Sequence, residues 1–272
     1  MTETDAAFER RFGGLRRLFG VAGAQRVFDA HVAVVGLGGV GSWAVEALAR
    51  SGVRRLTLID LDHVSESNIN RQLQATGDTL GQAKAEALRD RIAAIHPRAD
   101  VVCIDDFVTP DNWPALLGGE RPDALIDACD QVRAKTALAA WAVANGVPFV
   151  SVGAAGGKRR AEAVALADLA DITHDPLLAQ LRYRLRKHHG APRAGAMGVT
   201  GVFSREPVAP PDPSCALDGG DGSLNCHGYG SLVSVTATFG MAAAGHVIDT
   251  IARGAGEKVK PASKGTKNHA II

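Results

Sequence analysis

Short apolar and β-branched runs alternate with longer amphipathic stretches through the first half of the chain. The short runs predict strands at residues 31–35, 56–59, 101–104, 124–126 and 147–152. Length and apolar spacing predict helices at residues 40–51, 81–95 and 132–145. Because strands joined by helical crossovers run parallel, this pattern predicts an α/β fold with a Rossmann-like, doubly wound and mostly parallel sheet.

The alternation of strand and helix stops near residue 155, where we place a boundary. Beyond it, residues 163–166 predict an antiparallel strand, and residues 175–188 a helix with its leucines facing inward. A basic, helical stretch at residues 8–30 precedes the first strand. We therefore expect an N-terminal helical segment at residues 1–30 and a Rossmann-like domain at 31–155. A C-terminal part with antiparallel strands and helices follows at 156–255, and a flexible tail at 256–272.

Composition restricts the cellular setting more than the chemistry. The chain has 272 residues, a net charge of +1 and four cysteines without a C-x-x-C pair, which indicates neither a zinc site nor a disulfide framework. The N-terminus has early acidic residues and no apolar core, so we expect no secretory signal and a cytoplasmic protein. Residues 224–248 carry no formal charge but many polar side chains, which favours a buried helix or subunit interface over a membrane span. Peripheral membrane association stays open.

The stretch Val32–Ser42, V-A-V-V-G-L-G-G-V-G-S, predicts an anion site. A strand that breaks into glycines and resumes as a helix presents backbone N–H groups and a helix N-terminus to phosphate. Asp60 ends the second strand about twenty residues later, where an acid accepts hydrogen bonds from ribose hydroxyls, and Asp62 is its neighbour. This much fits the dinucleotide sites of NAD and FAD enzymes equally well.

The loop after the second strand, S-E-S-N-I-N-R-Q at residues 65–72, favours a triphosphate. It places Arg71 near the same strand ends, together with the amides of Asn68 and Gln72. A dinucleotide needs no arginine there, whereas the planar donors of a guanidinium neutralise and orient triphosphate oxygens.

Lys84 lies one turn before Leu88 on the apolar stripe of the predicted helix at 81–95. An ammonium at the inward end of such a stripe needs a partner, because burying it unpaired is costly. Phosphate is the partner we favour, and snorkelling of the side chain to solvent is the alternative.

Asp127 and Asp130, in D-A-C-D, follow the fourth predicted strand and are expected to face the same crevice. Carboxylates beside a triphosphate repel it unless Mg²⁺ lies between them, so we predict Asp130 as the metal residue. A role for Asp130 as N-cap of the next helix is the alternative, and it is compatible with the first.

Taken together, these motifs resemble the ubiquitin-activating-enzyme-like (HesA/MoeB/ThiF) superfamily, whose members adenylate a carboxylate. Within it, the chain is most similar to the bacterial tRNA threonylcarbamoyladenosine dehydratases over residues 8–245. The signatures are R-F-G-G, G-G-V-G-S-W-A, N-R-Q, D-D-F-V-T-P-D-N, G-A-A-G-G, H-D-P-L, V-F-S and V-T-A-T-F-G. The resemblance implies that ATP adenylates the threonyl carboxylate of N6-threonylcarbamoyladenosine beside the anticodon, and that ring closure then releases AMP.

The resemblance also implies roles for individual residues, ATP and Mg²⁺ as cofactors, a tRNA substrate and a homodimer. Arg71, Lys84 and Asp130 would be catalytic, with Asp130 binding Mg²⁺. Gly36, Gly38, Gly39 and Gly41 would bind phosphate, and Asp60 and Asp62 would bind the ribose. Asn68 and Gln72 would bind the triphosphate together with Arg71 and Lys84. The apolar stretch at 232–248 is the candidate dimer interface.

Departures from the superfamily pattern keep other functions open. Carrier-activating relatives have pairs of zinc-binding cysteines, which this chain lacks, and an acceptor cysteine, for which its only candidate is Cys226. They also have an arginine at the position of Gly14, and Arg11 or Arg17 could take over its role. An adenylating enzyme for a ubiquitin-like sulfur-carrier protein, with sulfur-transfer or carrier partners, is the main rival. An NAD-dependent dehydrogenase and a non-enzymatic nucleotide sensor are the others. The basic run at residues 182–193 favours tRNA, although a solvated helix face also explains it.

Overall fold

One seven-stranded sheet organises the computed structural model, which describes residues 3–210 and 229–254. The strand order is β3-β2-β1-β4-β5-β7-β6, and all neighbouring pairs are parallel except β6 and β7. The strands are β1 (His31–Val35), β2 (Arg55–Ile59), β3 (Asp100–Ile104), β4 (Ala124–Asp127), β5 (Phe149–Val152), β6 (Val164–Asp168) and β7 (Thr200–Ser204). The predicted α/β class and mostly parallel sheet are confirmed.

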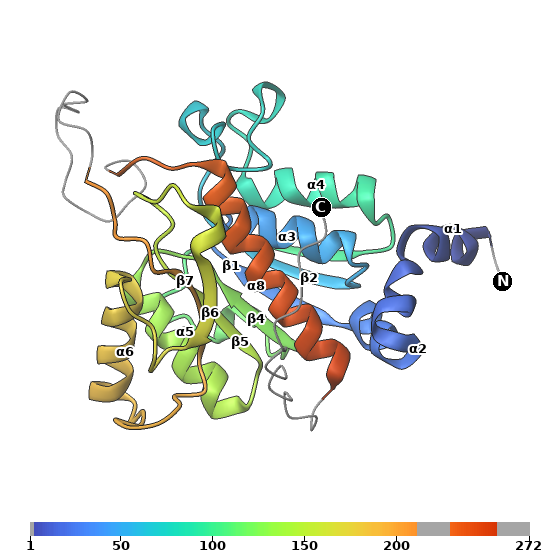
Figure 1. Ribbon diagram of the computed structural model, residues 1–272. Coiled ribbons are helices and arrows are strands. Elements are labelled where there is room, and N and C mark those ends of the chain that lie inside the picture. The colour runs from blue at the N-terminus through green and yellow to red at the C-terminus, as the bar shows by residue number, and fades with distance from the viewer. Residues whose placement is uncertain (1–2, 211–228, 255–272) are drawn as a thin grey trace, which may run out of the picture.

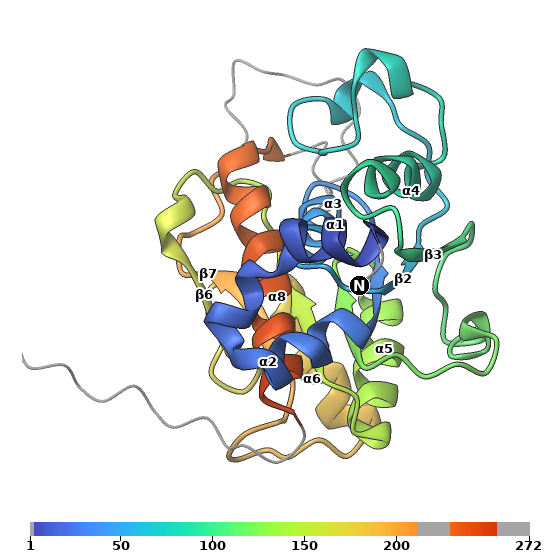
Figure 2. The same ribbon diagram turned by 90° about the vertical axis from the view of Figure 1, so that its right-hand side faces the viewer.

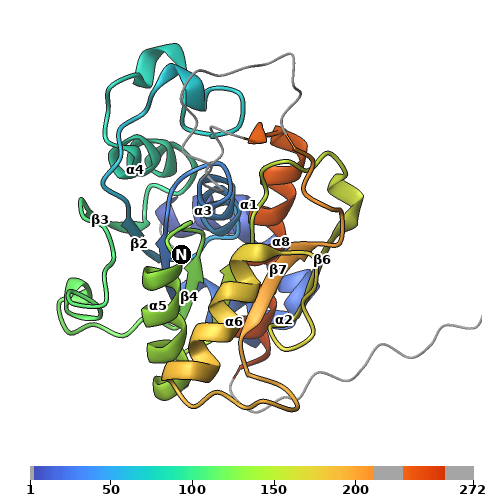
Figure 3. The ribbon, with the colours of Figure 1, turned by 90° about the vertical axis from the view of Figure 1, so that its left-hand side faces the viewer.

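Helices cover both faces of this sheet (Figures 1–3). One face packs against α3 (Gly41–Arg50), α4 (Lys84–Ile95) and α8 (Val233–Arg253), and the other against α5 (Val132–Asn145) and α6 (Pro176–His188). The N-terminal helices are α1 (Glu3–Phe12) and α2 (Gly14–Asp29), and α2 contacts α8. Short 3-10 turns are η1 (Glu66–Asn68), η2 (Gly77–Thr79), η3 (Ala115–Leu117) and η4 (Ala161–Ala163).

Alternation along each central strand divides the apolar core into two layers. In β1, Val32 and Val34 belong to the layer under α3 and α8, whereas Ala33 and Val35 belong to the layer under α5 and α6. Successive side chains of a strand point to opposite faces, so a strand covered on both sides must be apolar throughout. That requirement explains why the sequence of the central strands predicts their positions.

The C-terminal part completes the same sheet. β7 runs parallel to β5, and the predicted antiparallel strand, β6, pairs with β7 at the edge. The sheet is therefore continuous across residue 155, and the proposed domain division stays a prediction. The tail predicted at 256–272 lies outside the described residues.

The uncharged stretch near the C-terminus forms most of α8, which crosses the sheet in Figure 1. Val235, Phe239, Ala243 and Val247 are buried on one face of α8, which packs against α3 and α2. Gly240 permits this approach, because a Cβ there would lie 2.9 Å from the Ala44 nitrogen. No helix in the described parts of the chain is long and apolar enough to cross a membrane.

Glu46 joins α3 to α4 and offers a test of this packing. The residue is 4% exposed, and its carboxylate accepts hydrogen bonds from Arg91 at 2.7 and 2.9 Å and from Arg50 at 2.7 Å. We expect Glu46→Gln to lower the free energy of unfolding by about 1–3 kcal/mol, because hydrogen bonds to a charged group are lost. Urea denaturation measures this, with Glu86→Gln, which removes an exposed pair to Arg89, as control.

The same carboxylate predicts a pH dependence. Burial opposes ionisation of Glu46, but hydrogen bonds from Arg91 and Arg50 outweigh it, so that the pKa of Glu46 is lowered. A lowered acidic pKa stabilises the folded state above the unfolded pKa, and this contribution disappears as the pH falls through the folded pKa. Equal stability of Glu46→Gln and wild type at neutral pH would contradict both expectations.

Candidate active site

The glycine turn between β1 and α3 is the meeting point of the loops after three strands. Gly36 has a φ of 84°, and a Cβ there would lie 2.7 Å from the Cys129 nitrogen and 2.8 Å from the Ala128 carbonyl carbon. Gly36 is therefore required both by its backbone conformation and by its contact with the loop after β4. A Cβ at Gly41 would collide with the Gly36 carbonyl oxygen, so the turn also packs on itself.

Unused backbone donors make this turn a candidate anion site. Among the described residues, the N–H groups of Gly38, Gly39 and Val40 donate to no acceptor, and Val40 caps α3 without a side-chain hydrogen bond. A Cβ at Gly38 would lie no nearer to a neighbour than 4.0 Å, from the Gln72 amide, so the turn is open there. Free N–H groups at a helix N-terminus bind phosphate.

Asp60 fixes the glycine turn to the end of β2. The residue is 8% exposed, and its carboxylate accepts hydrogen bonds from the Leu37 nitrogen at 2.6 Å and the Asp62 nitrogen at 2.8 Å. Burial raises the pKa of Asp60, against the charge of Lys84 and these two N–H groups. The ribose role stays a prediction, for which each carboxylate oxygen still has a lone pair.

Lys84 and Asp62 form an ion pair that sequence reasoning did not foresee. Lys84 begins α4 and is 6% exposed, and its Nζ lies 2.7 Å from Asp62 Oδ2. The buried ammonium thus has the partner that it requires, but it is a carboxylate of the same site. Phosphate contact by Lys84 and ribose contact by Asp62 stay predictions, and each would compete with this pair.

Arg71 lies against the glycine turn with one donor unused. Its Cγ would be 3.2 Å from a Cβ at Gly39, and its Nη1 donates to the Ser67 carbonyl at 2.6 Å and to Asn70 Oδ1 at 2.9 Å. The Nε atom is buried and has no partner within the described structure. Trp43 holds the backbone, donating from Nε1 to the Arg71 carbonyl at 3.0 Å. A buried, unpaired guanidinium donor fits an oxyanion.

The amides of this loop stabilise its shape. Asn68 Oδ1 accepts the Ser65 N–H at 3.1 Å in a capping box, so part of its hydrogen-bonding capacity is used locally. Gln74, which sequence reasoning missed, is 3% exposed and donates to the Leu37 carbonyl at 2.8 Å and to Gln72 Oε1 at 3.3 Å. Gln74 thereby ties the 65–72 loop to the glycine turn.

Asp127 and Asp130 have different surroundings, contrary to the expectation that both face one crevice. Asp127 is fully buried, with Oδ2 bound by Lys135 Nζ at 3.0 Å and by Ser151 Oγ at 2.7 Å. Asp130 is exposed and has no hydrogen-bond partner among the described residues. The N-cap of α5 is Gln131, so the alternative of Asp130 as N-cap is wrong.

A metal at Asp130 would need further ligands from the nucleotide. The described residues contain no group of three or more histidine, cysteine or acidic side chains able to hold an ion. Mg²⁺ is commonly bound by one or two carboxylates together with substrate phosphates and water. The exposed, unpaired Asp130 carboxylate fits that kind of site.

Lys135 and Ser151 are the main omissions of the sequence reasoning. Lys135 precedes Leu138, Ala139 and Ala142 at intervals of three, four and seven residues, and all four are buried. This is the signal that singled out Lys84, a lysine on an apolar helical stripe. Ser151 lies within β5 and has no comparable signal.

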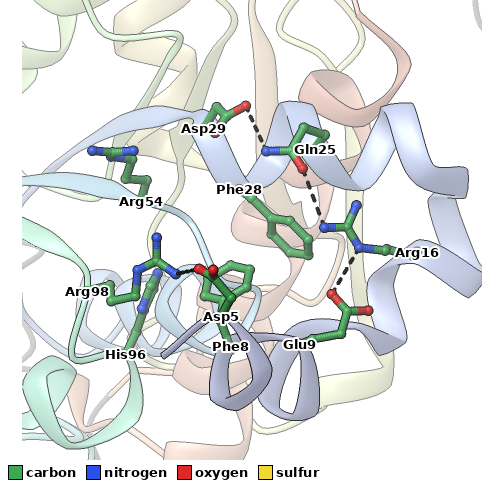
Figure 4. A pocket seen from close by; sticks show the side chains of 10 residues that line it. All are labelled: Asp5, Phe8, Glu9, Arg16, Gln25, Phe28, Asp29, Arg54, His96 and Arg98. Carbon is green, nitrogen blue, oxygen red and sulfur yellow. Dashed lines mark hydrogen bonds and ion pairs between the residues drawn. The ribbon is translucent and has the colours of Figure 1, made fainter. Parts of the chain in front are cut away.

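A hollow of about 350 Å³ is shown in Figure 4. Asp29, Arg54 and Arg98, which line it, come just before β1, β2 and β3, so it lies near the amino ends of these strands, whereas the glycine turn follows the carboxyl end of β1. The hollow is lined by side chains of α1 and α2 and by Arg54, His96 and Arg98. Two ion pairs lie within it, Arg98 with Asp5 at 3.2 Å and Arg16 with Glu9 at 3.2 Å. This pairing and its position separate the hollow from the candidate nucleotide site.

The other basic residues singled out in the sequence have different surroundings. Arg11 is exposed and donates to the Ile95 carbonyl at 2.8 Å, whereas Arg17 is exposed and has no hydrogen bond in the described chain. On α6, Arg182 is committed to the Leu169 and Ile172 carbonyls. Lys187 lies 5.5 Å from the ring centre of the exposed Tyr183.

Comparison with known proteins decides the family. The ThiF family model matches residues 13–269. This chain belongs to the ThiF family. Among ThiF-like relatives, the tRNA threonylcarbamoyladenosine dehydratase of Escherichia coli is 43% identical over 251 residues, covering 89% of this chain and 93% of the relative. The enzyme of the same name from Haemophilus influenzae is 40% identical over 249 residues, covering 90% and 94%.

Solved structures agree with this assignment. The E. coli dehydratase TcdA in complex with ATP superposes with a TM-score of 0.80 at 42% identity, covering 90% of this chain and 95% of that one. The molybdopterin-synthase adenylyltransferase of E. coli is 37% identical over only 135 residues, half of this chain and 53% of the relative. Similarity of this chain to the dehydratases therefore covers much more of its length than similarity to the molybdopterin-synthase adenylyltransferase.

The two described cysteines lack the features of a nucleophile. Burial raises the pKa of the Cys103 thiol, whose Sγ donates to the Ala85 carbonyl. Burial and the neighbouring Asp127 carboxylate raise the pKa of Cys129 well above its ordinary value. Such thiols carry little thiolate at neutral pH. Cys226 lies outside the described residues.

Proposed function

We propose that this protein catalyses the ATP-dependent dehydration of N6-threonylcarbamoyladenosine next to the anticodon of tRNA. The threonyl carboxylate attacks the α-phosphate of ATP, and pyrophosphate leaves. A nucleophile of the same threonylcarbamoyl group then attacks the activated carbonyl, the ring closes, and the carboxylate oxygen departs in AMP. The observation that carries the substrate is the 43% identity with the E. coli dehydratase, and the nucleotide is supported by the buried, unpaired Nε of Arg71 beside the free N–H groups of the glycine turn.

Each predicted site residue has a role that suits this chemistry. Gly36, Gly38, Gly39 and Gly41 bring the backbone to the phosphates, and Asp60 and Asp62 accept the ribose hydroxyls. Arg71 and Lys84, with Asn68 and Gln72, orient the triphosphate and stabilise negative charge that develops at the α-phosphate. Asp130 would hold Mg²⁺, which, when bound, neutralises the phosphate oxygens and assists departure of pyrophosphate.

The Lys84–Asp62 pair gives ATP binding a defined local rearrangement. When the exposed Asp62 carboxylate turns to the ribose, it releases the buried Lys84 ammonium, which then needs a new anion. The triphosphate supplies that anion. Ribose and phosphate recognition are therefore coupled through one side-chain pair.

The assembly and setting of the protein belong to the same proposal. We expect a cytoplasmic homodimer, with the partly exposed N-cap residue Leu232 and Val233 and Met241 of α8 facing the second copy. Either Arg11 or Arg17 would take the place of the arginine missing at Gly14. A sulfur-carrier protein is the alternative substrate, because two molybdopterin-synthase adenylyltransferases are 38% and 37% identical to this chain over half of its length.

Pyrophosphate release from ATP separates these functions in one assay. The purified protein is given ATP and Mg²⁺ with tRNA that carries threonylcarbamoyladenosine, with the same tRNA lacking the modification, or with a sulfur-carrier protein. We expect release only with the modified tRNA. Release with the carrier protein alone would favour the alternative, and no release in any arm would contradict adenylation.

Replacement of Cys226 tests whether a thioester is needed. Closure of a ring within one substrate molecule requires no enzyme-bound intermediate, so Cys226→Ala is expected to keep full turnover. Single-turnover rates of AMP formation measure this, with Cys103→Ala as the matched control. A large loss of rate in Cys226→Ala alone would show covalent catalysis.

A further inference from the structure

A fully buried ion pair lies beneath the turn that carries Asp130. The side chains of Lys135 and Asp127 both have 0% exposure. Lys135 Nζ donates to Asp127 Oδ2 at 3.0 Å, to the Val152 carbonyl at 2.7 Å and to Ser151 Oγ at 3.3 Å. The three ammonium hydrogens are thus used, so Lys135 acts on a ligand only through other residues.

Stability alone does not explain such a cluster. Moving two charges out of water costs about as much as their attraction returns, and apolar residues of similar shape often stabilise a core as well. A fully satisfied buried network does fix one geometry. The question is which geometry this cluster fixes.

The second Asp127 oxygen leads from the cluster to the candidate active site. Asp127 Oδ1 accepts the Cys129 N–H at 3.3 Å and the Cys129 thiol at 3.0 Å. The peptide between Ala128 and Cys129 is the surface against which Gly36 packs, and the Ala128 nitrogen donates to the Val35 carbonyl at 2.8 Å. The cluster therefore sets the turn at 128–130 against the glycine turn, and Asp130 is the last residue of that turn.

We propose that Lys135 is a positioning residue for nucleotide and metal binding. By fixing Asp127 between β4, β5 and the first turn of α5, Lys135 holds the Asp130 carboxylate at a set place relative to the phosphate-binding glycines. This inference rests on the proposed function, in which Asp130 binds Mg²⁺ beside the triphosphate. The role of Lys135 is geometric, and it has no contact with the reacting atoms.

The test removes both buried charges together. Asp127→Asn combined with Lys135→Met leaves no unpaired charge in the core, so it separates positioning from simple destabilisation. Isothermal titration measures the affinity for a non-hydrolysable ATP analogue with and without Mg²⁺. We expect the affinity with Mg²⁺ to fall by about tenfold or more, the usual effect of losing a residue that orients a metal ligand, and the affinity without Mg²⁺ to change less.

A matched control is Lys158→Met, which removes another buried lysine, one bound to the Ser204 carbonyl at 2.9 Å. If the double variant binds the ATP analogue in the presence of Mg²⁺ as tightly as wild type does, the positioning role of Lys135 is refuted. If the double variant does not fold, Ser151→Ala decides, with several-fold weaker Mg²⁺-dependent binding expected and unchanged binding refuting the proposal. Absence of any Mg²⁺ effect in wild type would instead contradict the metal role of Asp130.

Discussion

Arg71→Ala is expected to lower kcat/KM for tRNA-dependent pyrophosphate release by about 10²–10³-fold, the usual effect of removing one preorganised charge-stabilising donor. The Cγ and Cδ atoms of Arg71 lie against Gly39, and its buried Nε donor has no partner in the described structure. We expect that unpaired donor to bind an α-phosphate oxygen as negative charge accumulates there. Initial-rate measurements with saturating ATP and varied modified tRNA give the value.

The control for Arg71→Ala must show that the fold survives. Arg71 also donates to the Ser67 carbonyl and to Asn70, so we expect a loss of stability of about 1–2 kcal/mol, which leaves the protein folded. Arg89→Ala removes an exposed arginine of α4 and should leave the rate unchanged. A normal rate in folded Arg71→Ala would refute the role of Arg71 in adenylation.

Asp130→Asn is the second substitution with a large expected effect. It keeps the size of the side chain and removes the charge that would bind Mg²⁺, so the pyrophosphate-release rate should fall by about 10–100-fold at fixed Mg²⁺. Because Asp130 is exposed and has no hydrogen bond within the described structure, unfolding should be unchanged. Rates measured over a Mg²⁺ series should show saturation shifted to higher concentration.

Asp111→Asn is the matched control, since Asp111 is an exposed aspartate outside the candidate site. It should behave as wild type throughout the Mg²⁺ series. An unaltered Mg²⁺ dependence in Asp130→Asn would mean that the metal is held elsewhere or is not required. Loss of activity in Asp111→Asn as well would point to a general charge effect.

The central sheet could be predicted because strands that are buried on both faces are apolar throughout, which is visible in the sequence. β1, His31–Val35, was located to the residue, and the other parallel strands through β5 to within a few residues. β7 was missed, since it follows the end of the strand-helix alternation and contains Gly201 within a short apolar run. Its place in the sheet depends on pairing with β5 and β6, which local sequence does not encode.

The candidate site divides in the same way. The glycine spacing predicts the candidate phosphate turn, because the positive φ of Gly36 and its close contact with the Ala128–Cys129 peptide require a glycine there. Contacts between distant segments could not be foreseen, as with Gln74 on the Leu37 carbonyl and Lys84 on Asp62. The prediction that Asp127 faces the crevice is wrong for the same reason, because its contact with Ser151, on another strand, is not visible in the local sequence.

Lys135 shows that one such contact was within reach. It lies on the apolar stripe of α5 just as Lys84 lies on that of α4, and both side chains end on a carboxylate. A buried lysine on an apolar stripe predicts a nearby anion, but only the fold shows whether that anion is a ligand or an aspartate.

Nucleoside analysis of the product tests the central claim most directly. Modified tRNA is incubated with the protein, ATP and Mg²⁺, digested to nucleosides under mild conditions, and measured by mass spectrometry. Dehydration predicts that threonylcarbamoyladenosine is replaced by a nucleoside lighter by one water, only when ATP is present and not with Arg71→Ala. An unchanged threonylcarbamoyladenosine signal while ATP is converted to AMP and pyrophosphate would contradict the account.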